Sequence, residues 1–436
     1  IQRWSGCPIQ RWSGCPTQRW SGTVEGRDPG IDRSTSHAGT MAGASTLNHI
    51  VKIASRCNLN CSYCYVYNQA DSTWRARPAV MSRETFSATV ERIRRHCLLS
   101  GQISVEILFH GGEPTLVGSE RFAWMCALAR ERLKDVARVT LAMQTNATRL
   151  SHSWLAVLRE HSVQIGISLD GPKEINDAFR VNHRGLGSHD AVVRGIELLR
   201  EAGLEFEILS VVQPGADPLA IHNHFLELGC SSISYLLPSY THDTVAPVRE
   251  KFGPTPCADF LIPIFDDWWF RRSINVSIRE FRNLARVILG GSSLLDSIGS
   301  PRLGFMCVDT DGSMQGLDKL RSCEDGLSSI PLNVHDADFE EIARASPFHA
   351  DVMRGLPLPT ACRACPERET CAGGYLPNRY SKARGFDNPS VWCADLLALF
   401  RHARMRLGVS HDETRRRRLE LAELRERTLA GATPTV

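Results

Sequence analysis

Residues 55–68 read S-R-C-N-L-N-C-S-Y-C-Y-V-Y-N and directly follow a run of apolar and β-branched residues. The segment contains three cysteines with the spacing CxxxCxxC: Cys57, Cys61 and Cys64. One short loop with this spacing can wrap three thiolates around a single iron–sulfur cluster, and three thiolates leave one iron of a 4Fe–4S cluster open for chemistry. A zinc loop is the alternative, but zinc requires a fourth ligand nearby, and Asn58 and Asn60 are poor zinc ligands.

Strand-like and helix-like segments alternate around and after this motif. Six apolar or β-branched runs predict buried parallel strands, at residues 49–55, 103–109, 139–145, 163–169, 205–212 and 233–238. Ser82 is a plausible helix N-cap. The apolar residues that follow it share one helical face: Phe86, Val90, Ile93 and Cys97. Six βα units with right-handed crossovers predict an α/β fold, a partial (β/α)6 TIM-like barrel whose functional groups gather at the carboxyl ends of the strands.

A second group of cysteines lies near the C-terminus. Its members are spaced CxxC-x5-C with a fourth cysteine further on: Cys362, Cys365, Cys371 and Cys393. Four thiolates form a closed set, which suits a cluster that carries electrons; from the spacing alone, zinc held by four thiolates is the competing interpretation. Four other cysteines lack ligand-like neighbours and are predicted to be buried apolar groups: Cys97, Cys126, Cys230 and Cys257.

Composition excludes several classes of protein. The chain has 436 residues, enough for two or three domains, and 15 cysteines, whose clustering in a reducing compartment indicates metal ligands rather than disulfides. Fifty-one basic and 48 acidic residues leave a net charge of +3, which is too small to indicate nucleic acid or a membrane surface as a partner. No apolar run reaches the roughly 18 residues of a membrane span, and no secretory signal is recognisable. These features predict a cytoplasmic protein.

The cysteine loop resembles the cluster loop of radical S-adenosylmethionine (radical SAM) enzymes, and further motifs follow in the order that this family shows. They are F-H-G-G-E-P at 109–114, Q-T-N at 144–146, S-L-D-G at 168–171 and D-A-F-R at 177–180. The resemblance implies that S-adenosylmethionine binds beside the cluster and is contacted by these residues: Tyr63, Gly111, Gly112, Glu113, Gln144, Asn146, Ser168 and Arg180. Taken singly, Asn146 could also cap a strand end and Arg180 could be a solvated charge.

The C-terminal cysteines resemble the SPASM domain of radical SAM peptide maturases, in which such positions hold an auxiliary cluster. Tyr375 stands where that pattern usually has a further cysteine, and only Cys307 and Cys323 resemble ligands of a first auxiliary cluster. The resemblance therefore implies at least two 4Fe–4S clusters. The runs at 51–75, 371–380 and 385–396 resemble FxsB-type maturases, which join an aromatic ring to a nearby side-chain carbon and so form a cyclophane.

The resemblance implies an enzyme that oxidatively modifies a ribosomally made precursor peptide. In this family, cleavage of S-adenosylmethionine yields a 5′-deoxyadenosyl radical that abstracts a hydrogen atom from an unactivated C–H bond. The expected product is the cyclophane cross-link; formylglycine formation on a sulfatase and thioether formation are the alternatives, and a non-enzymatic iron–sulfur electron carrier is a remote one. The expected partners are the peptide and an electron donor such as ferredoxin or flavodoxin. Catalytic side chains are not identified beyond the weak candidates Glu324 and Asp325, for which a solvated turn is the alternative role.

The chain is predicted to divide into five parts. An octapeptide repeat, IQRWSGCP, fills the start of an extension at 1–40 that is predicted to be disordered, and a mis-set start would account for it. The remaining parts are a radical SAM core at 41–240, a connecting region at 241–300, a SPASM-like domain at 301–408 and a basic helical tail at 409–436.

Overall fold

The computed structural model describes residues 48–271, 276–299 and 304–430. The predicted repeat-containing extension at 1–40 lies outside the described residues. Among the described helices, none combines the length and the apolar character that crossing a membrane requires.

A ten-stranded sheet forms the centre of the molecule, with the order β10-β9-β8-β1-β2-β3-β4-β5-β6-β7. Its strands are β1 (Asn48–Ala54), β2 (Ser104–Gly111), β3 (Arg138–Thr145), β4 (Gln164–Ser168), β5 (Glu207–Val211), β6 (Ser232–Leu236), β7 (Ser277–Ile278), β8 (Phe305–Val308), β9 (Ser313–Gln315) and β10 (Ser329–Asn333). Strands β1 to β6 pair in parallel in chain order, which confirms all six predicted strands within a few residues at each end.

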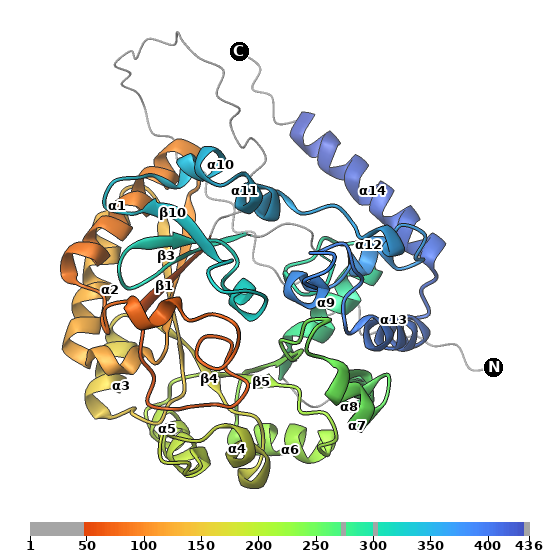
Figure 1. Cartoon of the computed structure of the whole chain (residues 1–436), viewed down its shortest axis with the longest axis horizontal. Helices are drawn as coiled ribbons and strands as arrows, with labels where there is room; N and C mark the ends of the chain where they lie inside the picture. Colours follow the sequence, from red (N-terminus) through yellow and green to blue (C-terminus); the bar gives the residue numbers. More distant parts are fainter. Residues whose placement is uncertain (1–47, 272–275, 300–303, 431–436) are drawn as a thin grey trace. The chain divides into compact units, whose positions relative to one another are not determined.

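Six helices follow the outside of the curved sheet (Figure 1). They are α1 (Arg83–Ser100), α2 (Ser119–Leu133), α3 (His152–Glu160), α4 (Lys173–Phe179), α5 (His189–Glu201) and α6 (Pro218–Leu228). Helix α1 begins as predicted, because Ser82 Oγ accepts a hydrogen bond from the Thr85 amide at 3.0 Å. Its apolar face and that of α2 are buried against β1 to β3, so the partial barrel and its core form where the apolar periodicity predicts them.

The sheet continues beyond the six predicted strands at both edges. Strand β8 pairs in parallel with β1, opposite Ile50 and its neighbours, and β9 and β10 follow it as antiparallel strands. These segments have only three to five residues each, too few for a period-2 pattern to be recognised, and the exposed edge of β1 determines their pairing. Residues after position 300 therefore complete the sheet that carries the cysteine loop.

The remaining helices are α7 (Ala246–Phe252), α8 (Pro256–Phe270), α9 (Arg279–Ile288), α10 (Ile342–Ala345), α11 (Pro347–Arg354), α12 (Arg368–Cys371), α13 (Cys393–Leu407) and α14 (His411–Ala430). Helix α13 packs on α8. Asp395 of α13 stabilises this contact, because its carboxylate accepts hydrogen bonds from the backbone amides of Cys257 and Ala258 in the first turn of α8. The four cysteines predicted to be apolar core residues are all buried: Cys97, Cys126, Cys230 and Cys257.

Candidate active site

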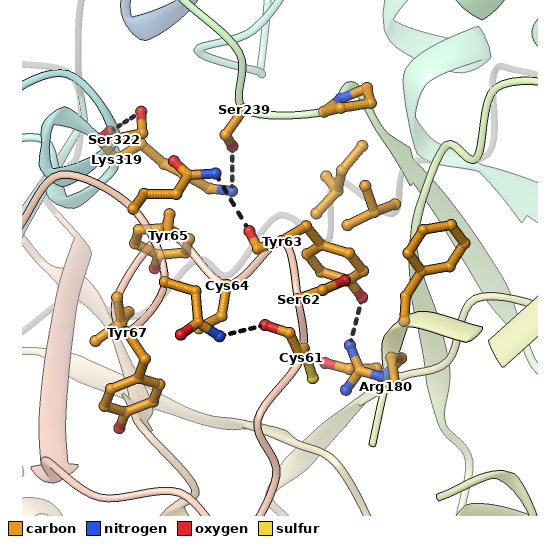
Figure 2. Close-up of a pocket in the computed structure, with 18 of the residues that line it drawn as sticks. Cys61, Ser62, Tyr63, Cys64, Tyr65, Tyr67, Arg180, Ser239, Lys319 and Ser322 are labelled. Carbon is orange, nitrogen blue, oxygen red and sulfur yellow. Dashed lines mark hydrogen bonds between the residues drawn. The ribbon is translucent and has the colours of Figure 1, made fainter. Parts of the chain in front are cut away.

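A cavity of about 1000 Å³ opens at the carboxyl ends of the barrel strands. One wall contains the cysteine loop and the strand ends of β2 to β6. The other contains lining residues from Pro238 onward, which we call the C-terminal wall. The members of the C-terminal wall are Pro238, Ser239, Tyr240, Thr241, Asp243, Thr244, Arg279, Lys319, Ser322, Cys323 and Lys382. The site thus combines residues that are far apart in the sequence (Figure 2).

The three cysteines of the CxxxCxxC loop all line this cavity and are partly exposed to it. Two groups can donate hydrogen bonds to the Cys57 sulfur: the Leu59 amide at 3.4 Å and Asn146 Nδ2 at 3.8 Å. Burial raises the pKa of the Cys57 thiol to about 12, so a positive charge such as iron is needed to keep its thiolate here. The loop therefore presents three thiolate donors and amides that would stabilise their charge.

Three tyrosines of the loop, whose side chains are labelled in Figure 2, hold it in place, each by a different hydrogen bond. Tyr63 donates a hydrogen bond to Asp170 at 2.5 Å, Tyr65 donates to Asp318 at 2.7 Å, and Tyr67 donates to the Ser55 carbonyl oxygen at 3.0 Å. Asp170 follows β4, Asp318 begins a 3-10 helix at Asp318–Ser322, and Ser55 follows β1. The alternating aromatic residues of the motif thus connect the loop to three separate parts of the molecule.

The two glycines at the end of β2 are required by backbone packing. Gly111 has φ +137°, and a Cβ atom there would lie 2.0 Å from the Ala54 carbonyl oxygen. At Gly112 a Cβ atom would lie 2.1 Å from the Arg56 carbonyl oxygen. Any larger residue at either position would therefore push the cysteine loop away from β2.

Glu113 lines the cavity but is only 1% exposed, and the protein itself uses both of its carboxylate oxygens. Oε1 accepts hydrogen bonds from the amide and hydroxyl of Thr115 and from the Thr145 hydroxyl, and Oε2 accepts one from the Asn146 amide at 2.8 Å. Glu113 therefore joins the end of β2 to the end of β3. The contact with S-adenosylmethionine that the resemblance implies for Glu113 would have to share these oxygens.

The remaining strand ends present amide and hydroxyl groups to the cavity. Gln144 Nε2 donates to Ser168 Oγ at 2.8 Å, and the absence of a side chain at Gly166 makes room for Gln144, whose Oε1 would lie 2.3 Å from a Cβ atom there. Asn146 donates to Asn58 Oδ1 at 2.9 Å, which links β3 to the cysteine loop. All the residues that the resemblance implies for S-adenosylmethionine therefore line one cavity.

Arg180 has an unused donor at this site. Its Nη1 donates to the Tyr63 hydroxyl at 2.8 Å, as Figure 2 shows, whereas its Nε is buried and has no hydrogen-bond partner. A buried guanidinium N–H without a partner is costly, and a carboxylate is the group that best satisfies it. The site therefore fits S-adenosylmethionine. It offers three thiolates that could hold a cluster and, beside them, the Arg180 guanidinium as a donor for the carboxylate.

The structure also brings the four C-terminal cysteines together, around a second and much smaller cavity of about 20 Å³. Cys371 ends α12, Cys393 begins α13, and three residues with positive φ follow Cys371: Ala372, Gly373 and Gly374. This left-handed turn reverses the chain immediately after the third cysteine. A 4Fe–4S cluster requires four cysteines close to one another, but their sulfur atoms do not surround a single point, because each thiolate binds a different iron. Among the described residues, no three His, Cys, Asp or Glu side chains are arranged around a single metal ion.

The two further cysteines of the doubtful auxiliary site lie in different surroundings. Cys323 lines the main cavity and its sulfur lies 3.7 Å from the Pro377 carbonyl oxygen, whereas Cys307 is fully buried within β8 and does not line the cavity. Burial raises the pKa of the Cys307 thiol far above its ordinary value. Tyr375, at the position where a cysteine is usual, is hydrogen-bonded to Asp296.

Buried ionic contacts surround Cys307. Arg321 is not exposed at all and contacts three carboxylates: Asp71 at 2.5 Å, Asp309 at 2.8 Å and Asp318 at 2.8 Å. Lys52, on β1, forms a further ion pair with Asp318. The segment that carries Cys307 and Cys323 is therefore held to β1 and to the end of the cysteine loop by protein charges.

The weak catalytic candidates do not line the cavity. Glu324 accepts a hydrogen bond from the Tyr380 hydroxyl at 2.6 Å, and Asp325 accepts one from the Ser72 amide at 2.7 Å. Sequence reasoning missed four charged residues that do line it: Asp243, Arg279, Lys319 and Lys382. No motif marks them, because only folding brings the C-terminal wall over the barrel mouth.

Comparison with known proteins agrees with this geometry. The model of the radical SAM superfamily matches residues 51–227. The chain is 28% identical over 374 residues to the cysteine-type anaerobic sulfatase-maturating enzyme of Clostridium perfringens (strain ATCC 13124), covering 83% of this chain and 97% of the relative. It is 34% identical over 227 residues to an uncharacterized protein of Methanothermobacter thermautotrophicus, covering 50% of this chain and 79% of the relative.

A solved structure of native anSMEcpe with bound AdoMet and Cp18Cys peptide superposes with a TM-score of 0.70 at 26% identity, covering 83% of this chain and 98% of that structure. The match extends well beyond the barrel and so includes the region that forms the C-terminal wall. Together with the family match and the relatives, this shows that the chain belongs to the radical SAM superfamily.

Proposed function

We propose that this enzyme oxidises a side-chain carbon of a peptide whose target residue enters the cavity between the barrel mouth and the C-terminal wall. The size of the cavity supports this. Sites for single small ligands occupy about 300–1,000 Å³, so a cavity of about 1000 Å³ has room for S-adenosylmethionine and for part of a second molecule. The Cp18Cys peptide bound in the similar structure of anSMEcpe agrees with a peptide as that second molecule.

The enzyme uses a 4Fe–4S cluster and S-adenosylmethionine. Together they provide the chemistry that abstracts a hydrogen atom from an unactivated C–H bond. In our proposal, Cys57, Cys61 and Cys64 hold the cluster, and Arg180 binds the carboxylate of S-adenosylmethionine through its free Nε. Gln144 and Ser168 contact the cofactor from the ends of β3 and β4. The tyrosines of the loop keep the three thiolates in register with these groups.

Three products are candidates. The motifs at 371–380 and 385–396 favour the cyclophane, in which an aromatic ring and a side-chain carbon each lose one hydrogen atom and become joined. The names of the relatives favour formylglycine, an aldehyde made from cysteine or serine. Both products require removal of two electrons from the peptide, and a thioether link is a third possibility with the same balance.

The C-terminal cysteines have a supporting role in this proposal. Four thiolates saturate a second cluster, so it would conduct electrons between a donor such as ferredoxin or flavodoxin and the active site, or brace the domain. It would not bind substrate, because none of its irons is open.

The proposal is tested by anaerobic reconstitution with iron and sulfide, followed by reduction in the presence of S-adenosylmethionine. We expect 5′-deoxyadenosine to form. Peptides encoded beside the gene are then assayed by mass spectrometry, with a hydrazide probe to distinguish an aldehyde from a cross-link. Modification of none of these peptides, despite deoxyadenosine formation, would contradict the assignment to peptides.

A matched pair of variants tests the cofactor contact. Arg180→Lys removes the planar fork of donors and should weaken binding of S-adenosylmethionine roughly tenfold. Arg184→Lys, in the exposed loop that follows, should bind it as the unaltered protein does. Equal affinity in the two variants would exclude Arg180 from the site.

A further inference from the structure

Lys319 is a partly buried cation that forms no ion pair within 4.0 Å among the described residues. It lies in the 3-10 helix Asp318–Ser322 and lines the main cavity. Its Nζ donates to Ser239 Oγ at 3.1 Å and lies 4.3 Å from the centre of the Tyr65 ring, as Figure 2 shows. In the part of the chain that the structure describes, no carboxylate forms an ion pair with it.

The carboxylates around Lys319 have other partners. Asp318 is bound by Lys52, Arg321 and the Tyr65 hydroxyl. Asp296 is near enough to interact with Lys319 electrostatically, but it accepts a hydrogen bond from Tyr375, and burial raises its pKa, which disfavours the charged form. Burial also lowers the pKa of Lys319, because the loss of hydration outweighs the attraction of the nearby Asp318, Cys64 and Asp296.

The surrounding wall has the same sign of charge. The C-terminal wall contributes three cations, Arg279, Lys319 and Lys382, and one carboxylate, Asp243. Asp243 already accepts a hydrogen bond from the Lys382 amide at 2.9 Å. Arg279 also forms an ion pair with Glu280 at 3.5 Å. The C-terminal wall therefore carries more cationic than anionic side chains.

We propose that Lys319, with Ser239 beside it, binds a carboxylate of the peptide substrate and so selects peptides that carry an acidic group near the oxidised residue. A carboxylate there would accept hydrogen bonds from the ammonium and the hydroxyl, and it would supply the missing counter-ion. The proposal rests on the proposed function, since it names the substrate class of the same site. The carboxylate of S-adenosylmethionine is a poorer occupant, because Arg180 offers its free Nε on the other side of the cysteine loop.

The carboxylate has two possible sources, an acidic side chain or the C-terminus of the peptide. Three fluorescein-labelled pentapeptides distinguish them: Gly-Phe-Asp-Ser-Gly amide, Gly-Phe-Asn-Ser-Gly amide, and Gly-Phe-Asn-Ser-Gly with a free C-terminal carboxylate. Binding is measured by fluorescence anisotropy on the reconstituted protein with S-adenosylmethionine and without reductant, so that no turnover occurs. We expect one of the two carboxylate peptides to bind about tenfold more tightly than the asparagine amide.

Variants attribute this preference to Lys319. Lys319→Met should abolish the preference while leaving affinity for the asparagine amide unchanged, and Lys319→Arg, which keeps the charge, should retain it. Lys134→Met removes an exposed lysine on the outer surface, whose partner is Glu131, and should bind like the unaltered protein. Iron content is measured on each variant to show that folding and reconstitution are intact.

Three outcomes would overturn the proposal: equal or undetectable binding of all three peptides by the unaltered protein, a preference that survives in Lys319→Met, or a Lys319→Met variant whose main defect is in binding S-adenosylmethionine. Failure of the proposed function is recognised separately. It would show as an absence of 5′-deoxyadenosine or of peptide modification on reduction, whatever the carboxylate preference measured without reductant.

Discussion

Asp71 and Arg321 form an ion pair at 2.5 Å in which neither side chain is exposed to solvent. Asp71 lies seven residues after the last cysteine of the CxxxCxxC loop, and Arg321 lies two residues before Cys323. Asp71 also accepts a hydrogen bond from the Gly326 amide at 3.0 Å. The pair therefore fastens the cysteine loop to the C-terminal part of the chain, and it does so beside the active-site cavity.

Removing Arg321 should be severely destabilising. Arg321→Met removes the ion-pair partner of the buried Asp71 and one of the cationic partners of Asp309 and Asp318, which keep Lys52 and Arg77. A buried charge left without its partner costs about 3–5 kcal/mol in the free energy of unfolding. Burial opposes the ionisation of Asp318, but Lys52 and Arg321 outweigh it and hold the pKa of this carboxyl well below its usual range. Urea unfolding measures the loss. Arg344→Met, which removes an exposed ion pair with Glu341, is the control and should change little.

Acid should destabilise the protein through His49. This ring is fully buried on β1, both of its nitrogens lack hydrogen-bond partners, and burial lowers its pKa to about 3. The unfolded chain takes up a proton near pH 6.5 whereas the native ring does not, so the contribution of His49 is complete above pH 6.5 and is lost as the pH falls.

Relative to His49→Phe, the unaltered protein should lose about 1.4 kcal/mol of unfolding free energy between about pH 7.5 and 5.5. Urea unfolding at several pH values measures this difference. His152→Gln changes an exposed ring at the start of α3 and should retain the original pH dependence. If His49→Phe has the same pH dependence as the unaltered protein, the native His49 ring becomes charged in this pH range. The low pKa of His49 would then be wrong.

The three cysteines of the loop should be essential for chemistry but not for folding. Changing Cys57, Cys61 and Cys64 together to Ala should abolish formation of 5′-deoxyadenosine, because the site that binds S-adenosylmethionine loses its iron. The four C-terminal cysteines line a separate cavity, so the variant should still fold and retain iron there. Residual deoxyadenosine, assayed by liquid chromatography after reduction, would refute the assignment of the loop.

Iron content should correspond to two clusters. We expect about eight irons per reconstituted chain rather than about twelve. Among the cysteines that the structure describes, Cys307 and Cys323 are the two that resemble ligands of a third cluster, and Tyr375 replaces a usual ligand. Cys307→Ala should leave the value unchanged, since this thiol is buried within β8 among ionic contacts. Cys371→Ala should lower it by about four. Iron analysis with Mössbauer spectroscopy checks each value, and a result near twelve would mean that other side chains complete the third site.

The sequence by itself determined the barrel and the principal motif. Buried parallel strands such as β3 are rich in apolar and β-branched residues, and helices such as α1 show a regular apolar face, so local patterns are sufficient to predict them. The cysteine spacing, the two glycines and Arg180 lie at strand ends or in adjoining loops, and parallel topology alone brings such ends to one edge. Their presence in one cavity was predictable for that reason.

The tertiary structure alone decided the other wall of the site. Lys319, Ser239 and Asp296 belong to no local pattern, and β8 to β10 are too short to show a strand period, so nothing in the sequence indicates that they meet. Their positions depend on long-range contacts such as the Asp71–Arg321 pair, which joins residues 250 positions apart. Electrostatic partners are chosen by proximity after folding, not by spacing along the chain, and this is why an isolated cation facing the substrate cavity becomes visible only in three dimensions.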